Sequence, residues 1–251
     1  MALSQLAHAA RPRRAAVART TARLAYVDNL RVLLAALVVA HHAGQAYGPT
    51  GGDWPLFNPT RAAILGPFFA VNASFFMGLF FLIAGYFVPA AYDRKGALGF
   101  LADRLVRLGV PLLFVSLALL LPFAYATQGH EQAFGPFLAA YLRRPEVGHM
   151  WFAGHLLVYA CGYAVWRRLA DRRAPAVPQP GAAPGHRALA AYALGLAAAT
   201  FVVRVAFPVD RWVYPAPFIR VEPAHLPQYL SLFMIGSVAY RRDWLGRLPA
   251  R

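Results

Sequence analysis

The sequence predicts an all-α fold, a polytopic bundle of about six transmembrane helices with both termini in the cytoplasm. Of its 251 residues, 59% are hydrophobic and 14% are charged, whereas roughly a quarter of the residues in a soluble domain are charged. Long apolar runs recur along the chain, as they do in proteins that cross a membrane several times. Arginines gather in short clusters between these runs, which is the pattern that the positive-inside rule describes.

The chain begins with a basic segment, residues 1–25, in which five arginines lie among alanines without apolar periodicity. We expect a disordered cytoplasmic tail here, followed by one integral membrane domain over residues 26–251. The alternative is a signal peptide formed by this segment and the apolar run after it. No small-x-small cleavage site precedes the histidines at the end of that run, which favours the tail.

Apolar runs predict where the six helices lie. A polar amphipathic segment over residues 92–107 leads into the third helix, which Pro111 and Pro122 are expected to kink or end. The polar loop before the fourth helix contains a short amphipathic piece around residues 134–142, and a flexible Pro/Ala/Gly linker over residues 167–187 follows that helix. The predicted helices cover about residues 30–47, 67–90, 108–126, 149–166, 188–207 and 226–240.

The distribution of basic residues predicts the orientation. Eighteen of the 25 lysines and arginines lie before the first helix, in segments 91–107 and 167–187, and after residue 240. The loops on the other side hold six, and Arg31 lies at a helix end. Because cytoplasmic loops carry the excess of positive charge, both termini are expected in the cytoplasm. The arginine-rich, lysine-poor composition resembles that of a high-GC bacterial genome, which predicts a multi-pass protein of the bacterial plasma membrane.

Several classes of partner and site are disfavoured. The membrane accounts for the net charge of +15, so no nucleic-acid partner is predicted. The single cysteine, Cys161, lies in an apolar segment and is interpreted as a packing residue. The adjacent His41 and His42 cannot both point at one ion from a regular helix, so no metal site is predicted. The sequence contains neither a phosphate-binding loop nor a Gly-x-Ser-x-Gly motif.

The first apolar helix carries the residues that most strongly indicate chemistry, because ionisable groups at membrane depth are costly. Arg31 and His42 are eleven positions apart, which places them within about 20° on one helical face and about 16 Å apart along the axis. His41 lies about 80° away from Arg31 and cannot share that face. We interpret His42 as the chemical residue and His41 as its support. The alternatives are a structural histidine bonded to a neighbouring helix for His42, a solvent-side polar residue for His41, and a positive-inside residue for Arg31.

Four more residues are candidates by their type and position. His155 lies within an apolar helix, where an ionisable side chain indicates either a site or a packed histidine. His149 and Trp151 begin the same helix and could equally form an anchor pair at the membrane interface. Arg204 lies at the outer end of the fifth helix, where it could contact an anionic acceptor or extend to the interface.

Four stretches taken together resemble the membrane acyltransferase-3 family, which includes bacterial O-antigen and glucan O-acyltransferases. In DNLRVLLAALVVAHHA, the family's arginine, ten residues and histidine fall on Arg31 and His42. LFFLIAGYFV resembles the family's second-helix motif, DRLVRLGVP its cytoplasmic Arg-x-x-Arg motif, and HMWFAGHLLVY its helix that begins just before Trp-Phe. These motifs follow in family order over residues 26–166, and YLSLFMIGSVAYRRDWL resembles a later family helix. The predicted spans are fewer than the family core usually has, which predicts either a chain truncated at its C-terminus or a shortened member of the family.

The resemblance implies an enzyme that moves an acyl group, often acetyl, from cytoplasmic acyl-CoA to a hydroxyl of a glycan or lipid-linked acceptor. His42, with Arg31, would be catalytic, since an imidazole that titrates near neutrality can take the proton of the attacking alcohol. Arg104 and Arg107 fall on the Arg-x-x-Arg motif and would bind the phosphates of coenzyme A, unless they are topology charges alone. Acyl-CoA is then a substrate, and no bound cofactor is expected. The residues expected to bind the acceptor or support the site are His41, His149, Trp151, His155 and Arg204.

Two other functions stay open at this point. The chain could be a transporter or flippase-like protein for a polar or lipid-linked solute, with buried histidines along the path. Transporters commonly contain inverted repeats, and no internal repeat is visible in this sequence. The chain could also be an inactive acyltransferase-like scaffold.

Overall fold

The computed structural model describes residues 25–49, 58–170 and 181–247 and is 79% helical. The predicted tail lies outside the described residues except for its last position, as does the middle of the predicted linker. The chain divides into two compact units. The first holds described residues up to Phe80, together with residues 181–183 and 238–247, and the second holds the described residues 81–170 and 184–237.

The first unit is built around helix α2 (Ala25–Gln45) and the beginning of α3 (Leu65–Arg104). The 21 residues of α2 span about 31 Å, enough to cross the hydrocarbon core of a bilayer. Leu34 is fully buried, and the Asn72 side-chain amide donates a hydrogen bond to the carbonyl of Leu37 at 3.2 Å. This bond from α3 to the backbone of α2 fixes how the two segments meet.

Helical structure extends from Leu65 to Gly129 in two parts that meet at a kink, where Gly96 has the non-helical angles φ 66° and ψ 174°. Beyond α3 the stretch consists of η1 (Leu105–Gly109), α4 (Val110–Phe114), η2 (Val115–Leu120), α5 (Leu121–Ala124) and η3 (Tyr125–Gly129), where η1, η2 and η3 are π-helical. Pro111 and Pro122, expected to kink or end the third helix, do not end it. Each lies just after a π-helical turn, which absorbs the missing backbone donor and the ring's clash with the preceding turn.

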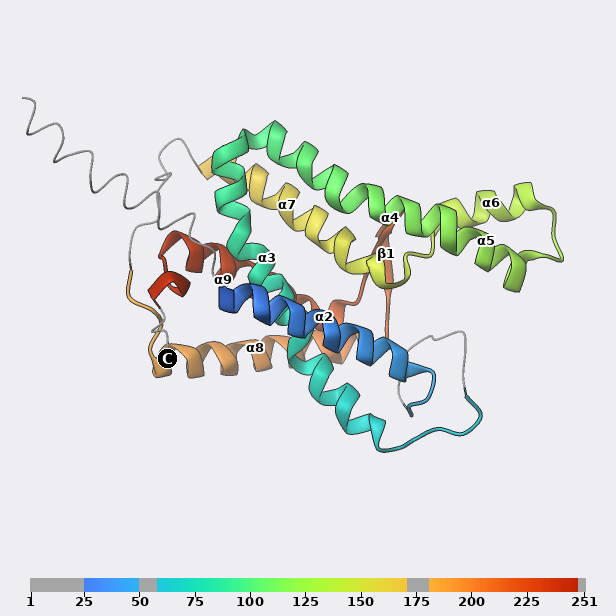
Figure 1. Cartoon of the computed structure of the whole chain (residues 1–251), viewed down its shortest axis with the longest axis horizontal. Coiled ribbons are helices and arrows are strands. Elements are labelled where there is room, and N and C mark those ends of the chain that lie inside the picture. The colour runs from blue at the N-terminus through green and yellow to red at the C-terminus, as the bar shows by residue number, and fades with distance from the viewer. Residues whose placement is uncertain (1–24, 50–57, 171–180, 248–251) are drawn as a thin grey trace, which may run out of the picture. The chain divides into compact units, whose positions relative to one another are not determined.

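In the second unit, α7 (Trp151–Ala170) lies alongside η1 and α4 (Figure 1). The short helix α6 (Phe134–Arg143), which the amphipathic pattern predicted, packs its Phe137 and Tyr141 side chains against Ala124 of α5. The sequence did not predict the antiparallel hairpin of β1 (Val213–Ala216) and β2 (Ile219–Val221), which lies between α8 (His186–Ala206) and α9 (Leu226–Arg241). The hairpin packs on α7, since β2 contacts it near Gly154.

Helices α3 and α9 cross closely within the second unit. A Cβ at Gly85 would collide with the carbonyl of Phe233, and a Cβ at Gly236 would collide with the carbonyl of Leu82. The Ser237 hydroxyl donates to the carbonyl of Gly85 at 3.1 Å. Paired glycines with a serine beside them are typical of membrane helices whose backbones touch.

Within the described residues, two helical stretches are long and apolar enough to cross a membrane, Leu65–Gly129 and His186–Ala206. The first has 65 residues, and the non-helical backbone of Gly96 divides it into two helical parts, each of which is long enough to cross the hydrocarbon core of a bilayer. No residue of α8 is buried, although Leu194, Phe201 and Val205 belong to it. A surface this apolar fits lipid better than water. Six spans and cytoplasmic termini remain predictions.

Candidate functional site

The two adjacent histidines near the end of α2 have different surroundings within the first unit. The His41 ring stacks on Phe76, with centroids 5.2 Å apart, and meets the edge of Phe69 at 5.0 Å. Its Nδ1 lies 3.3 Å from the amide nitrogen of Asn72. Because that nitrogen also donates to the Leu37 carbonyl, the amide is oriented with its NH₂ toward His41, and Nδ1 is the acceptor. His41 is therefore a buried, packed imidazole.

His42 is only partly buried, and its ring meets that of His41 edge on at 5.4 Å. Its Nδ1 lies 2.6 Å from Oε1 of Gln45, one turn further along α2. Because Oε1 can only accept, Nδ1 carries the proton in the neutral ring and the basic lone pair lies on Nε2. Such a ring can accept a proton at a defined atom.

Arg31 lies near the opposite end of α2 and is exposed, with 56% of its side chain accessible. It pairs with Asp28 at 3.8 Å. The structure places Arg31 and His42 in the same helix, as predicted, but the helical rise separates them by about 16 Å. They do not touch, and the catalytic role of Arg31 stays a prediction.

Arg104 and Arg107 lie in the second unit, where they differ in their ion pairing. Asp103 binds both Lys95, at 2.6 Å, and Arg107, at 2.9 Å. The Arg104 guanidinium lies over the ring of Phe100, 5.2 Å from its centroid. Its Nε is buried and has no hydrogen-bond partner in the described part of the chain. Arg104 is therefore the better placed of the two to receive an anion.

The first turns of α7 bring Trp151 and His155 together in an aromatic cluster. Trp151 stacks on Tyr229 with centroids 5.7 Å apart, and its backbone carbonyl lies 3.0 Å from Nδ1 of His155. Phe81 lies at the centre, 6.0 Å from the His155 ring and 4.7 Å from Tyr229. His149, whose side chain is exposed, lies in the turn η4 (Gly148–Met150) just before this cluster.

Glu222 and His225 form a polar pair between β2 and α9 that the sequence analysis did not identify. The buried carboxylate of Glu222 accepts a hydrogen bond from the backbone N–H of Asp210 at 2.8 Å and lies 3.5 Å from Nε2 of His225. Burial raises the pKa of Glu222, but these bonds and the charge of Arg204 outweigh burial and hold that pKa below its ordinary value. Arg204 is thus close to a carboxylate of its own chain. The only sequence signal was a glutamate three residues before a histidine.

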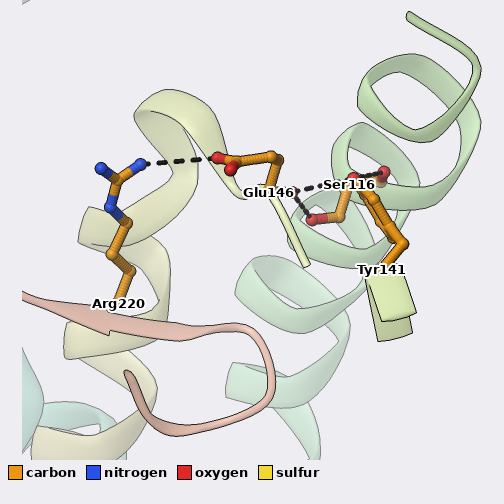
Figure 2. A network of polar contacts seen from close by, with 4 residues as sticks. All are labelled: Ser116, Tyr141, Glu146 and Arg220. Carbon is orange, nitrogen blue, oxygen red and sulfur yellow. Dashed lines mark hydrogen bonds and ion pairs between the residues drawn. The ribbon is translucent and has the colours of Figure 1, made fainter. Parts of the chain in front are cut away.

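Another set of polar side chains connects the hairpin to the loop before α7 (Figure 2). Arg220 of β2 pairs with the carboxylate of Glu146 at 3.5 Å. The backbone carbonyl of Glu146 accepts a hydrogen bond from the hydroxyl of Ser116, in η2. The hydroxyl of Tyr141, in α6, donates to the Ser116 carbonyl at 2.8 Å and also lies 3.3 Å from the Glu146 carbonyl. Burial, followed by the charge of Glu146, raises the pKa of Tyr141 to about 12, so the phenol remains a donor at neutral pH. Within the residues described, no group of three or more His, Cys, Asp and Glu side chains could hold a metal ion.

A family model described as an acyltransferase domain, of the acyltransferase-3 type, matches residues 24–249. No curated protein and no solved structure gives a significant match to the chain. The family match covers both units and each of the site residues described above.

Proposed function

Because this chain belongs to the membrane acyltransferase-3 family, we propose that it transfers an acetyl group from cytoplasmic acyl-CoA to a hydroxyl of a glycan or other acceptor. The reaction takes place at the bacterial plasma membrane, with membrane lipids around the helices. Acyl-CoA is the donor substrate, and neither a bound cofactor nor nucleic acid takes part. The proposal adds donor, acyl group and acceptor to the acyltransferase activity that the family carries.

The observation that carries the proposal is the hydrogen bond from His42 to Gln45, 2.6 Å long. It supports Nε2 of His42 as the general base. The acceptor hydroxyl gives its proton to Nε2 while its oxygen attacks the thioester carbonyl. The new C–O bond forms, the C–S bond breaks, and the proton passes to the departing thiolate of coenzyme A. His41 supports the helix end through its contacts with Asn72 and Phe76.

The donor's phosphates are assigned to Arg104. A guanidinium binds phosphate through parallel, charge-assisted hydrogen bonds, and a partly buried one is less screened by water and salt. Arg104 has no carboxylate bonded to it in the described residues, whereas Arg107 shares Asp103 with Lys95. Arg107 therefore contributes positive charge around the site, and Arg104 makes the direct contacts.

The test measures acetyl transfer by the purified chain in lipid nanodiscs, with radiolabelled acetyl-CoA as the donor and a glycan as the acceptor. The release of free coenzyme A gives the rate. We expect Arg104→Ala to raise KM for acetyl-CoA at least tenfold, about 1.4 kcal/mol of lost binding. Arg107→Ala should raise it less. Arg168→Ala, an exposed arginine of another cluster, is the control and should leave KM unchanged. Release of coenzyme A that does not depend on the glycan would contradict the proposed acceptor, and equal KM in all four proteins would contradict the proposed donor site.

A further inference from the structure

Two buried polar atoms lie on consecutive turns of α7 without a hydrogen-bond partner. His155 is 3% exposed and Tyr159 is 9% exposed. Nε2 of His155 and the hydroxyl oxygen of Tyr159 make no hydrogen bond to any described residue. Buried polar groups of native proteins are almost always paired, so an orphaned pair points to a ligand or a water.

The hydrogen bond that Nδ1 of His155 makes determines whether Nε2 donates or accepts. Nδ1 lies 3.0 Å from the carbonyl oxygen of Trp151, and a carbonyl oxygen can only accept. Nδ1 therefore carries the proton of the neutral imidazole, and Nε2 presents a lone pair. The orphaned atom of His155 needs a donor.

Tyr159 adds the complementary atom, because its hydroxyl can both donate and accept. A ligand that satisfies the two atoms must donate to His155 and can accept from Tyr159. An alcohol hydroxyl does both. A thioester carbonyl only accepts, so the reacting group of the acyl donor cannot by itself satisfy Nε2 of His155.

The surroundings of the two residues are aromatic. Phe81 lies 6.0 Å from the His155 ring and 5.4 Å from the Tyr159 ring. Tyr229 lies 6.4 Å from His155, and Phe233 lies 5.2 Å from Tyr159. Aromatic rings beside a few fixed polar atoms suit a neutral ligand with apolar C–H faces and hydroxyls, which describes a sugar ring.

We propose that His155 and Tyr159 bind a hydroxyl group of a sugar acceptor, which donates to Nε2 of His155 and accepts from the Tyr159 hydroxyl. The inference rests on the proposed function for the identity of the acceptor, and it assigns these two residues to acceptor binding. It requires no change in the covalent chemistry described above.

The experiment measures binding of methyl glucoside to the full chain in nanodiscs by calorimetry, without acyl-CoA, with tetrahydropyran as the hydroxyl-free control. Tyr159→Phe removes only the hydroxyl. His155→Asn removes Nε2 and keeps a donor for the Trp151 carbonyl. Tyr141→Phe is the matched control, since that buried tyrosine has its own partner, the Ser116 carbonyl at 2.8 Å.

We expect wild type and Tyr141→Phe to bind methyl glucoside with the same affinity. Tyr159→Phe and His155→Asn should each bind it at least tenfold more weakly. None of the four proteins should bind tetrahydropyran. Failure of the wild type to bind the glucoside would overturn the inference. So would variants that keep wild-type affinity and change only the unfolding temperature, because the two atoms would then hold a structural water. Binding that depends on both residues in a chain that transfers no acyl group would refute the proposed function and leave this site standing.

Discussion

At the scale of single residues, His41 and His42 show how one position along a helix changes the role open to a side chain. His41 is enclosed by Phe69, Phe76 and Asn72, whereas His42 is partly accessible and bonded to Gln45. The helical angle alone separated their faces in the sequence. It could not indicate that His41 contacts Asn72, which lies 31 positions away. Nor could it indicate which tautomer of His42 the bond to Gln45 favours.

The first prediction concerns that tautomer. Gln45→Ala removes the oxygen that holds the proton on Nδ1 of His42, so the lone pair is no longer fixed on Nε2. We expect kcat for acetyl transfer to fall on the order of tenfold while KM for acetyl-CoA stays the same, because the donor site is unchanged. Steady-state kinetics of the purified chain measure both constants.

The control for this change is Gln132→Ala, in an exposed loop where the backbone of Gln132 donates to the Gly129 carbonyl and accepts from the Tyr125 hydroxyl, so the substitution leaves both bonds in place. It should keep wild-type kcat. Equal kcat in Gln45→Ala and wild type would show that the amide does not orient the base.

At the scale of elements, α3 and α9 can cross as closely as they do because glycines, which have no side chain, occupy the point of contact. Gly85→Ala or Gly236→Ala places a methyl group against a backbone carbonyl of the other helix. We expect each to lower the free energy of unfolding by about 1–3 kcal/mol, the usual cost of overpacking. Chemical denaturation of the purified chain in detergent measures the change.

Gly195→Ala in α8 is the matched control, because nothing lies within 4 Å of the added methyl group. There the higher helix propensity of alanine should raise stability by roughly 0.5–1 kcal/mol. Opposite signs at the two kinds of site are the expected result. A stabilising Gly85→Ala would mean that the helices do not meet as described.

The loop before α7 gives a second prediction at this scale. Glu146 holds this loop through its backbone carbonyl, which accepts a hydrogen bond, and through its carboxylate, which pairs with Arg220 (Figure 2). Ser116, which is fully buried, donates to the Glu146 carbonyl, so Ser116→Ala should cost about 1 kcal/mol or more of unfolding free energy. Glu146→Ala keeps that carbonyl and removes only an ion pair whose carboxylate is 51% exposed. Its cost should be under about 1 kcal/mol.

Denaturation of the two variants side by side checks this order. The reverse order would assign the stability of the loop to the ion pair with Arg220. The sequence showed neither interaction, since the partners lie 30 and 74 positions apart.

At the scale of the whole molecule, the sequence predicted a helical chain because apolar runs and polar breaks are local signals. It located α6 from its amphipathic pattern and the acyltransferase family from four short motifs. It missed the hairpin, whose strands are only 4 and 3 residues long and whose turn places Phe218 at φ 62° without a glycine. It also missed the Glu222–His225 pair and the orphaned His155 and Tyr159 atoms, because such pairings depend on tertiary packing.

The measurement that tests the central claim most directly compares acetyl transfer by wild type, His42→Ala and His130→Ala at equal protein level in membranes. His130 lies in an exposed loop and has no part in the mechanism. If Nε2 of His42 is the general base, His42→Ala should lower kcat by roughly 10²–10⁴-fold while His130→Ala keeps wild-type kcat. Transfer by His42→Ala at the wild-type rate would contradict the account.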